Sequence, residues 1–199
     1  MNILISVILV ANILSLAGNI LFTSSSLFKS RTKIIILQTS NHLLSSIAQF
    51  LQSAFSGMVQ DVLLLIKNIV LLFVKQNHKI IRIIINVTCI ILGLVLGILL
   101  NVLLNDNIWY GYLPVAGTFI FSTTASIIFI KEKINPNLDE FIIKIAIIIN
   151  AIFWLIYGLQ IKLYPVTIFN CITITLCVYR IIIIVKNVIT NKKQKSHKE

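Results

Sequence analysis

Long, almost uncharged apolar runs dominate this sequence and restrict how the chain can fold. A membrane-spanning helix needs about 20 apolar residues, because the hydrocarbon core of a bilayer is about 30 Å thick. Seven windows meet that requirement, at residues 3–27, 34–54, 57–74, 80–104, 110–130, 141–160 and 164–187. A transmembrane barrel would show shorter segments of alternating polarity. The sequence therefore predicts an all-α transmembrane protein with seven helices.

The composition also indicates that lipid is the main partner. Hydrophobic residues make up 58% of the 199 residues and charged residues 12%, whereas soluble domains have about 45–50% and about 25%. A soluble fold of this length would have too few polar side chains to cover its surface. The first run has no basic region before it and no clear cleavage site, so we expect it to be a retained span rather than a signal peptide.

The basic residues predict the orientation of the spans. The net charge is +11, which in a soluble protein would suggest nucleic acid, but here the lysines and arginines lie between apolar runs. The first, third and fifth gaps and the tail are basic, whereas the other gaps carry at most one lysine. Because basic loops stay in the cytoplasm, we expect the N-terminus outside and the C-terminus inside. The polar tail, residues 188–199, is expected to be disordered or to lie on the lipid surface.

An internal repeat divides the chain. LAGNILFTSSSLF, from Leu16, aligns with VAGTFIFSTTASI, from Val115, and pairs Gly18 with Gly117. Further along, Asn41 pairs with Asn150, and Asp61 pairs with Asn170 at the same spacing.

Three spans followed by a single linker span return the chain to the side from which it started, so the second triplet is parallel to the first. We therefore expect a first triple-helix repeat over residues 1–76, a linker helix over 77–106 and a second repeat over 107–187. Gly93 and Gly97 on the linker predict close helix contact.

The chain is similar to the YgjV-type family of bacterial inner-membrane proteins, in the segments SLFKSRTKIIILQ, SAFSGMVQDVLLLIKNIVLLF and YLPVAGTFIFSTTASI. That resemblance covers nearly the whole chain and implies a multi-pass protein of the bacterial inner membrane, in a family without a firmly assigned activity. More distantly the chain resembles the SWEET, PQ-loop and PnuC transporters, which share the three-one-three design.

The SWEET resemblance also implies site residues. SWEETs place an asparagine on the third helix of each triplet and an aromatic residue on the helix before it. Asn170 and Trp154 match this pattern in the second triplet, whereas the first triplet has Asp61 and a serine pair, Ser45 and Ser46. The chain also lacks the Pro-Gln dipeptide, so the resemblance does not imply a sugar substrate.

Two charged residues lie inside the third apolar run. Lys67 is near its middle, where a lysine costs roughly 2.5–3.5 kcal/mol on insertion scales; it either faces a wet interior or extends towards the cytoplasmic surface. Asp61 either contacts a substrate or lies at the outer water interface. Six residues rotate a helix by about 600°, so these two side chains point in different directions and cannot pair well.

Uncharged polar and aromatic residues complete the candidate binding site. Asn41, His42 and Asn150 fall near the middle of their spans and either form hydrogen bonds between helices or line a shared cavity. In such a cavity, coupling of transport to protons through His42 is one hypothesis. Trp154 and Tyr157 lie within one turn of each other, as a stacking wall for a ligand ring or as core or lipid-facing aromatics.

No catalytic motif occurs, and the three cysteines have no metal-ligand spacing, so we expect neither an enzyme nor a cofactor or metal. The leading hypothesis is a transporter or facilitator for a small polar solute, and a homo-oligomer of this chain is one option for its assembly. The alternative is a non-transporting membrane subunit, whose polar residues would pack against one another and leave no cavity.

Overall fold

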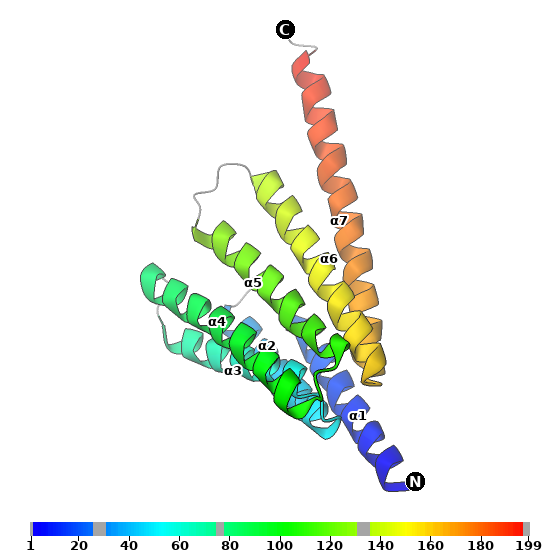
Figure 1. Ribbon diagram of the computed structural model, residues 1–199. Coiled ribbons are helices and arrows are strands. Elements are labelled where there is room, and N and C mark those ends of the chain that lie inside the picture. The colour runs from blue at the N-terminus through cyan, green and yellow to red at the C-terminus, as the bar shows by residue number, and fades with distance from the viewer. Residues whose placement is uncertain (1, 26–30, 75–77, 131–135, 197–199) are drawn as a thin grey trace.

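The structure is a computed structural model that describes residues 2–25, 31–74, 78–130 and 136–196. Within these residues the chain forms seven α-helices and one 3₁₀ turn (Figure 1). They are α1 (Asn2–Ser25), α2 (Arg31–Leu51), α3 (Phe55–Phe73), α4 (Lys79–Leu104), η1 (Trp109–Tyr112), α5 (Leu113–Ile130), α6 (Pro136–Gln160) and α7 (Tyr164–Ser196). Six of these helices, all except α2, are long and apolar enough to cross a membrane. The chain is thus a multi-pass membrane protein by its helix lengths and composition.

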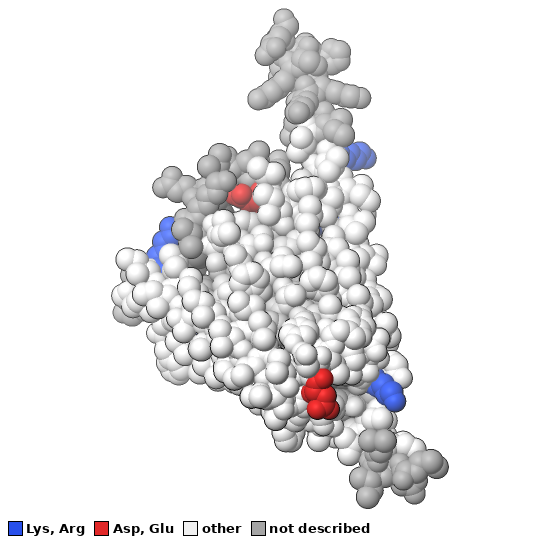
Figure 2. All heavy atoms as spheres, in the orientation of Figure 1, with Lys and Arg blue, Asp and Glu red and all other residues white. Residues whose placement is uncertain are grey.

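The outer surface of the molecule matches a lipid environment. Many large apolar side chains are exposed, including Leu9, Phe50, Ile80 and Leu103. On the face shown in Figure 2, the coloured charged side chains lie towards the two ends, and the surface between them is nearly all uncharged. The basic residues Lys29, Lys75, Lys131 and Lys133, which helped to predict orientation, lie outside the described residues.

The helix ends differ from the predicted windows in two informative places. α6 begins at Pro136, five residues before its window, because proline fits the first turn of a helix and Asp139 favours the positive end of the helix dipole. α7 continues to Ser196, so the tail is helical as far as residue 196 and the expectation of a disordered tail from residue 188 is wrong; a position on the lipid surface stays a prediction. The run from Asn187 to Ser196 contains no proline or glycine to end the helix, and its lysines favour the negative end of the dipole.

α2 is the helix whose average composition is too polar for a typical span. Its polar residues Gln38, His42, Ser45 and Gln49 recur every three or four positions and line the interior of the molecule. Large apolar residues on the opposite stripe are exposed, namely Ile36, Leu43, Ile47 and Phe50. This helix therefore presents apolar side chains outwards and polar side chains inwards, which lowers its mean hydropathy without making it a surface helix.

Six helices form a closed ring. α1 contacts α2, α2 contacts α3, α3 contacts α5, α5 contacts α6, α6 contacts α7, and α7 contacts α1 again. Asn12 on α1 helps to close the ring: its Nδ2 donates to the Lys162 carbonyl at 3.0 Å, and the Tyr164 backbone N–H donates to its Oδ1 at 3.0 Å.

α4 packs outside this ring, against α3, α5 and η1. Gly93 and Gly97 lie buried in its inner face. A Cβ atom at Gly97 would come within 2.6 Å of Nε2 of Gln60 on α3 and of a methyl group of Val115 on α5. The predicted close helix contact at these two glycines is therefore confirmed, and it involves both α3 and α5.

The turns that join α2 to α3 and α6 to α7 have matching backbones. Ser53 and Lys162 both have positive φ, at 54° and 58°. In the first turn the Ala54 N–H donates to the Gln49 carbonyl, and in the second the Leu163 N–H donates to the Gly158 carbonyl, each at 2.9 Å. The two turns are separated by the same distance along the chain as Asn41 and Asn150.

The two ends of the molecule are packed differently. At the end that holds the α2–α3, α4–α5 and α6–α7 connections, side chains interlock, and several are less than 2% exposed: Gln49, Ser56, Asn101, Pro114, Tyr157 and Leu163. Towards the other end, the helices α4 to α7 spread apart (Figure 1). We call the first the packed end and the second the spread end.

Candidate functional site

A central cavity of about 350 Å³ lies inside the ring. All six ring helices contribute to its wall, and α4 does not. The polar and charged lining residues are Asn19 from α1; Gln38, Asn41, His42, Ser45 and Gln49 from α2; Asp61, Lys67 and Asn68 from α3; Thr118 and Ser122 from α5; Asn150 from α6; and Asn170 from α7. Seven of the eight residues predicted as a binding site line this cavity, and Tyr157 does not.

Asp61 is the only acidic residue of the cavity wall and is 6% exposed. Its Oδ1 lies 2.8 Å from Nδ1 of His42, and its Oδ2 accepts a hydrogen bond from Nε2 of Gln49 at 2.5 Å. Each carboxylate oxygen therefore has a partner on α2, which offsets part of the cost of burying the charge. Of the two positions considered for Asp61, the structure has the cavity wall rather than the outer water interface.

Lys67 lies one turn and a half further along α3 and is half-buried. It lines the central cavity and also a second cavity of about 230 Å³ between α3, α4 and α5. Among the described residues, the structure records no acidic partner within salt-bridge distance of Lys67. As expected from their separation on the helix, Asp61 and Lys67 do not pair with each other.

Two asparagines occupy equivalent positions against glycines. A Cβ atom at Gly18 would come within 2.9 Å of Oδ1 of Asn41, and one at Gly117 would come within 2.8 Å of Oδ1 of Asn150. The glycines thus allow α1 and α5 to approach the amides of α2 and α6 closely. Oδ1 of Asn150 is buried without a hydrogen-bond partner, which leaves an acceptor on a residue of the cavity wall.

Residues that align in the sequence repeat also line the cavity together. In five aligned pairs, both residues line the cavity: Asn41 with Asn150, Asn19 with Thr118, Phe22 with Phe121, Ser45 with Trp154, and Asp61 with Asn170. The cavity wall thus contains matching positions of the aligned sequence segments, with different side chains at most of them.

Trp154 and Tyr157 have separate roles. Their rings meet edge to face with centroids 5.8 Å apart, but only Trp154 lines the cavity. Tyr157 is fully buried; its hydroxyl donates to the Ala54 carbonyl at 3.2 Å and accepts from the Gly57 N–H at 3.3 Å. Tyr157 therefore fastens α6 to the α2–α3 turn at the packed end instead of forming a wall for a ligand.

Several residues that line the cavity were not predicted from the sequence. Gln38 and Gln49 belong to the polar stripe of α2. Ser122 begins the run Ser122–Thr124, which the sequence repeat aligns with Thr23–Ser25. The spacing of three or four residues between Gln38, His42, Ser45 and Gln49 is a signal that would have identified Gln38 and Gln49.

No protein-family model, curated protein or solved structure matches this chain in comparisons with known proteins.

Proposed function

We propose that this protein is a transporter or facilitator for a small polar solute, which binds in the central cavity between the two triplets. The observation that carries the proposal is a polar cavity, lined by all six ring helices, inside a molecule whose outer surface is apolar. The alternative, a non-transporting subunit, predicts polar side chains packed against one another without a cavity. The volume of about 350 Å³ favours transport.

The architecture that we propose is two parallel three-helix repeats, α1–α3 and α5–α7, joined by α4. Three features support it: the matching turns with positive φ at Ser53 and Lys162, the equivalent glycine–asparagine contacts, and the aligned residues in the cavity wall. In this arrangement α2 crosses the membrane as a seventh span. Its polar stripe then faces the cavity instead of lipid.

We also propose that the N-terminus is outside and the C-terminus in the cytoplasm of a bacterial inner membrane. The alternation of basic and non-basic gaps supports this orientation, and the YgjV-type resemblance supports the location. The spread end is then cytoplasmic and the packed end faces outwards. The structure would correspond to an inward-facing state, and rocking of one triplet against the other would expose the cavity to the opposite side.

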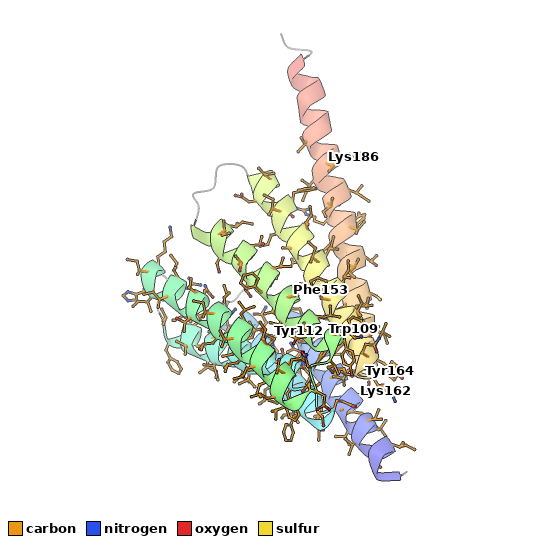
Figure 3. All side chains as sticks on the ribbon, in the orientation of Figure 1. Trp109, Tyr112, Phe153, Lys162, Tyr164 and Lys186 are labelled. Carbon is orange, nitrogen blue, oxygen red and sulfur yellow. The ribbon has the colours of Figure 1, made fainter. Side chains whose placement is uncertain are left out.

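Uptake into proteoliposomes tests the proposal. A panel of radiolabelled sugars, amino acids, carboxylates and nucleosides is compared between protein-containing and empty vesicles, and at least one solute is expected to enter faster with protein. Asn170→Ala and Trp154→Ala change the cavity wall and should reduce that uptake about tenfold or more. Trp109→Ala is the matched control, because Trp109 lies at the packed end (Figure 3) and is 62% exposed. This variant should leave uptake nearly unchanged. Equal uptake by all four proteins would contradict a substrate site in this cavity.

A further inference from the structure

The two permanent charges of the cavity wall, on Asp61 and Lys67, are not paired with each other. His42 is the third titratable side chain of the wall. Each oxygen of Asp61 already has one hydrogen-bonding neighbour, His42 at one and Gln49 at the other. The carboxylate is therefore partly satisfied by the protein, whereas Lys67 is not paired with it.

Lys67 supplies positive charge with no recorded acidic partner among the described residues. It lies where the central cavity meets the cavity between α3, α4 and α5, because both are lined by Leu64, Lys67, Thr118, Phe121 and Ser122. A charged group away from water is unfavourable unless it is paired. A ligand with a negative group would provide the missing pair, and hydrogen bonds between charged groups are the strong ones.

The neighbours of Lys67 in the central cavity suit an anionic group. Thr118 and Ser122 on α5 have hydroxyl groups, and Asn68 on α3 has an amide that can donate hydrogen bonds. Phe121 and Trp154 line the same cavity and offer apolar area for the remainder of a ligand. The wall around Lys67 thus combines one positive charge without an ion-pair partner in the described part of the chain, several neutral donors and an aromatic surface.

We infer that the ligand of the central cavity is a small organic anion, with one carboxylate or phosphate group at Lys67 and its body against Phe121 and Trp154. This inference rests on the proposed function in that the ligand is the transported solute. The same negative group is also present on an anionic phospholipid, so the experiment separates these two sources.

Three probes of nearly equal size and shape test the charge preference: benzoate, benzamide and benzamidinium, with charges of −1, 0 and +1. The chain has two tryptophans, so in a Trp109→Phe protein the fluorescence reports on Trp154 in the cavity wall. Benzoate is expected to quench this fluorescence with an affinity at least about tenfold higher than that of benzamide, because hydrogen bonds to charged groups contribute more than neutral ones. Benzamidinium should bind weakest. Equal binding of all three, or preference for benzamidinium, would overturn the inference.

Variants of Lys67 then locate the charge. In the Trp109→Phe background, Lys67→Gln should lose the preference for benzoate over benzamide, and Lys67→Arg should retain it. Lys186→Gln is the control, because Lys186 is exposed on α7 far from the cavity, and it should keep the full preference. If Lys67→Gln does not fold, the three probes on the protein with Lys67 still decide the question. A folded Lys67→Gln protein with undiminished preference would refute the role of Lys67.

Mixed micelles distinguish a solute from a lipid headgroup. Adding phosphatidylglycerol or phosphatidylcholine should change the benzoate affinity by less than about twofold. Displacement of benzoate by phosphatidylglycerol alone would assign the negative group to lipid and overturn the solute inference. Because these are binding measurements, benzoate binding without any uptake would contradict the transport proposal but not the anion preference. Transport that favours neutral or cationic solutes would contradict the anion preference but not the transport proposal.

Discussion

At Asp61 the arrangement of three side chains decides whether a carboxylate can remain buried in the middle of a membrane protein. His42 contacts one oxygen and Gln49 donates to the other, and both come from the polar stripe of α2. Asp61 in turn gives that stripe a partner on α3. A half-satisfied group of this kind would be strongly destabilising, so α2 and α3 depend on each other for their placement.

Asp61→Asn should destabilise the protein by about 1–3 kcal/mol, because a neutral amide would replace a carboxylate that has a partner at each oxygen, and hydrogen bonds to charged groups contribute more than neutral ones. Thermal unfolding in detergent, followed by intrinsic fluorescence, measures the change as a lower Tm. Asp106→Asn is a matched control: Asp106 is exposed and has φ of 50°, a conformation that asparagine adopts readily, and its Tm should be nearly unchanged. The interpretation fails if both variants unfold at the same temperature.

Tyr157→Phe removes the hydroxyl that connects α6 to the α2–α3 turn and leaves a buried carbonyl and N–H with one partner fewer. We expect a loss of about 1–2 kcal/mol, without a cavity, since only one oxygen atom is deleted. Tyr179→Phe deletes the same atom from an exposed side chain of α7 and should have little effect. Equal Tm values for the two variants would show that the hydroxyl of Tyr157 does not hold the packed end together.

At the scale of elements, the apolar runs predict where helices form, because a span must be apolar and about 20 residues long. They do not predict function within a helix. α2 was recognised as a window from its apolar residues, but which of its faces points inwards follows from its contacts with α1 and α3. Tyr157 shows the same limit: its sequence neighbour Trp154 lines the cavity, and only packing shows that the tyrosine is used for structure. The helix over residues 188–196 was not predicted, because composition indicates polarity and not helix continuation.

The two equivalent turns give a prediction about elements. Ser53 and Lys162 have positive φ, a conformation in which β-branched residues are strained by about 1–3 kcal/mol. Ser53→Val and Lys162→Val should therefore each lower the Tm, whereas Ser53→Gly and Lys162→Gly should not, because glycine adopts positive φ without strain. Similar losses at both turns are expected from their matching backbone hydrogen bonds. A loss at one turn only would argue that the turns are not energetically equivalent.

For the whole molecule, the closed ring explains how a short chain encloses polar groups in lipid. Six helices contribute to the wall, α4 covers the junction of α3 with α5, and large apolar residues remain outside. Since the packed end contains the interlocked side chains around Tyr157 and Leu163, we propose that a solute reaches the cavity from the spread end. The direction from which a solute enters thus depends on which end faces the cytoplasm.

Two lysines at opposite ends of the apolar part of α7 test that orientation. Lys162 lies in the turn before α7 at the packed end, next to Tyr164, and Lys186 lies towards the other end of the helix (Figure 3). From Tyr164 to Lys186 the helix rises about 33 Å, enough to cross the hydrocarbon core of about 30 Å. In a protein with Cys89, Cys171 and Cys177 replaced by serine, Lys162→Cys should react with a membrane-impermeant maleimide in intact cells. Lys186→Cys should react only in inside-out vesicles. The reverse pattern would place the spread end outside and make the structure outward-facing, whereas labelling of both positions from one side would mean that α7 does not cross the bilayer.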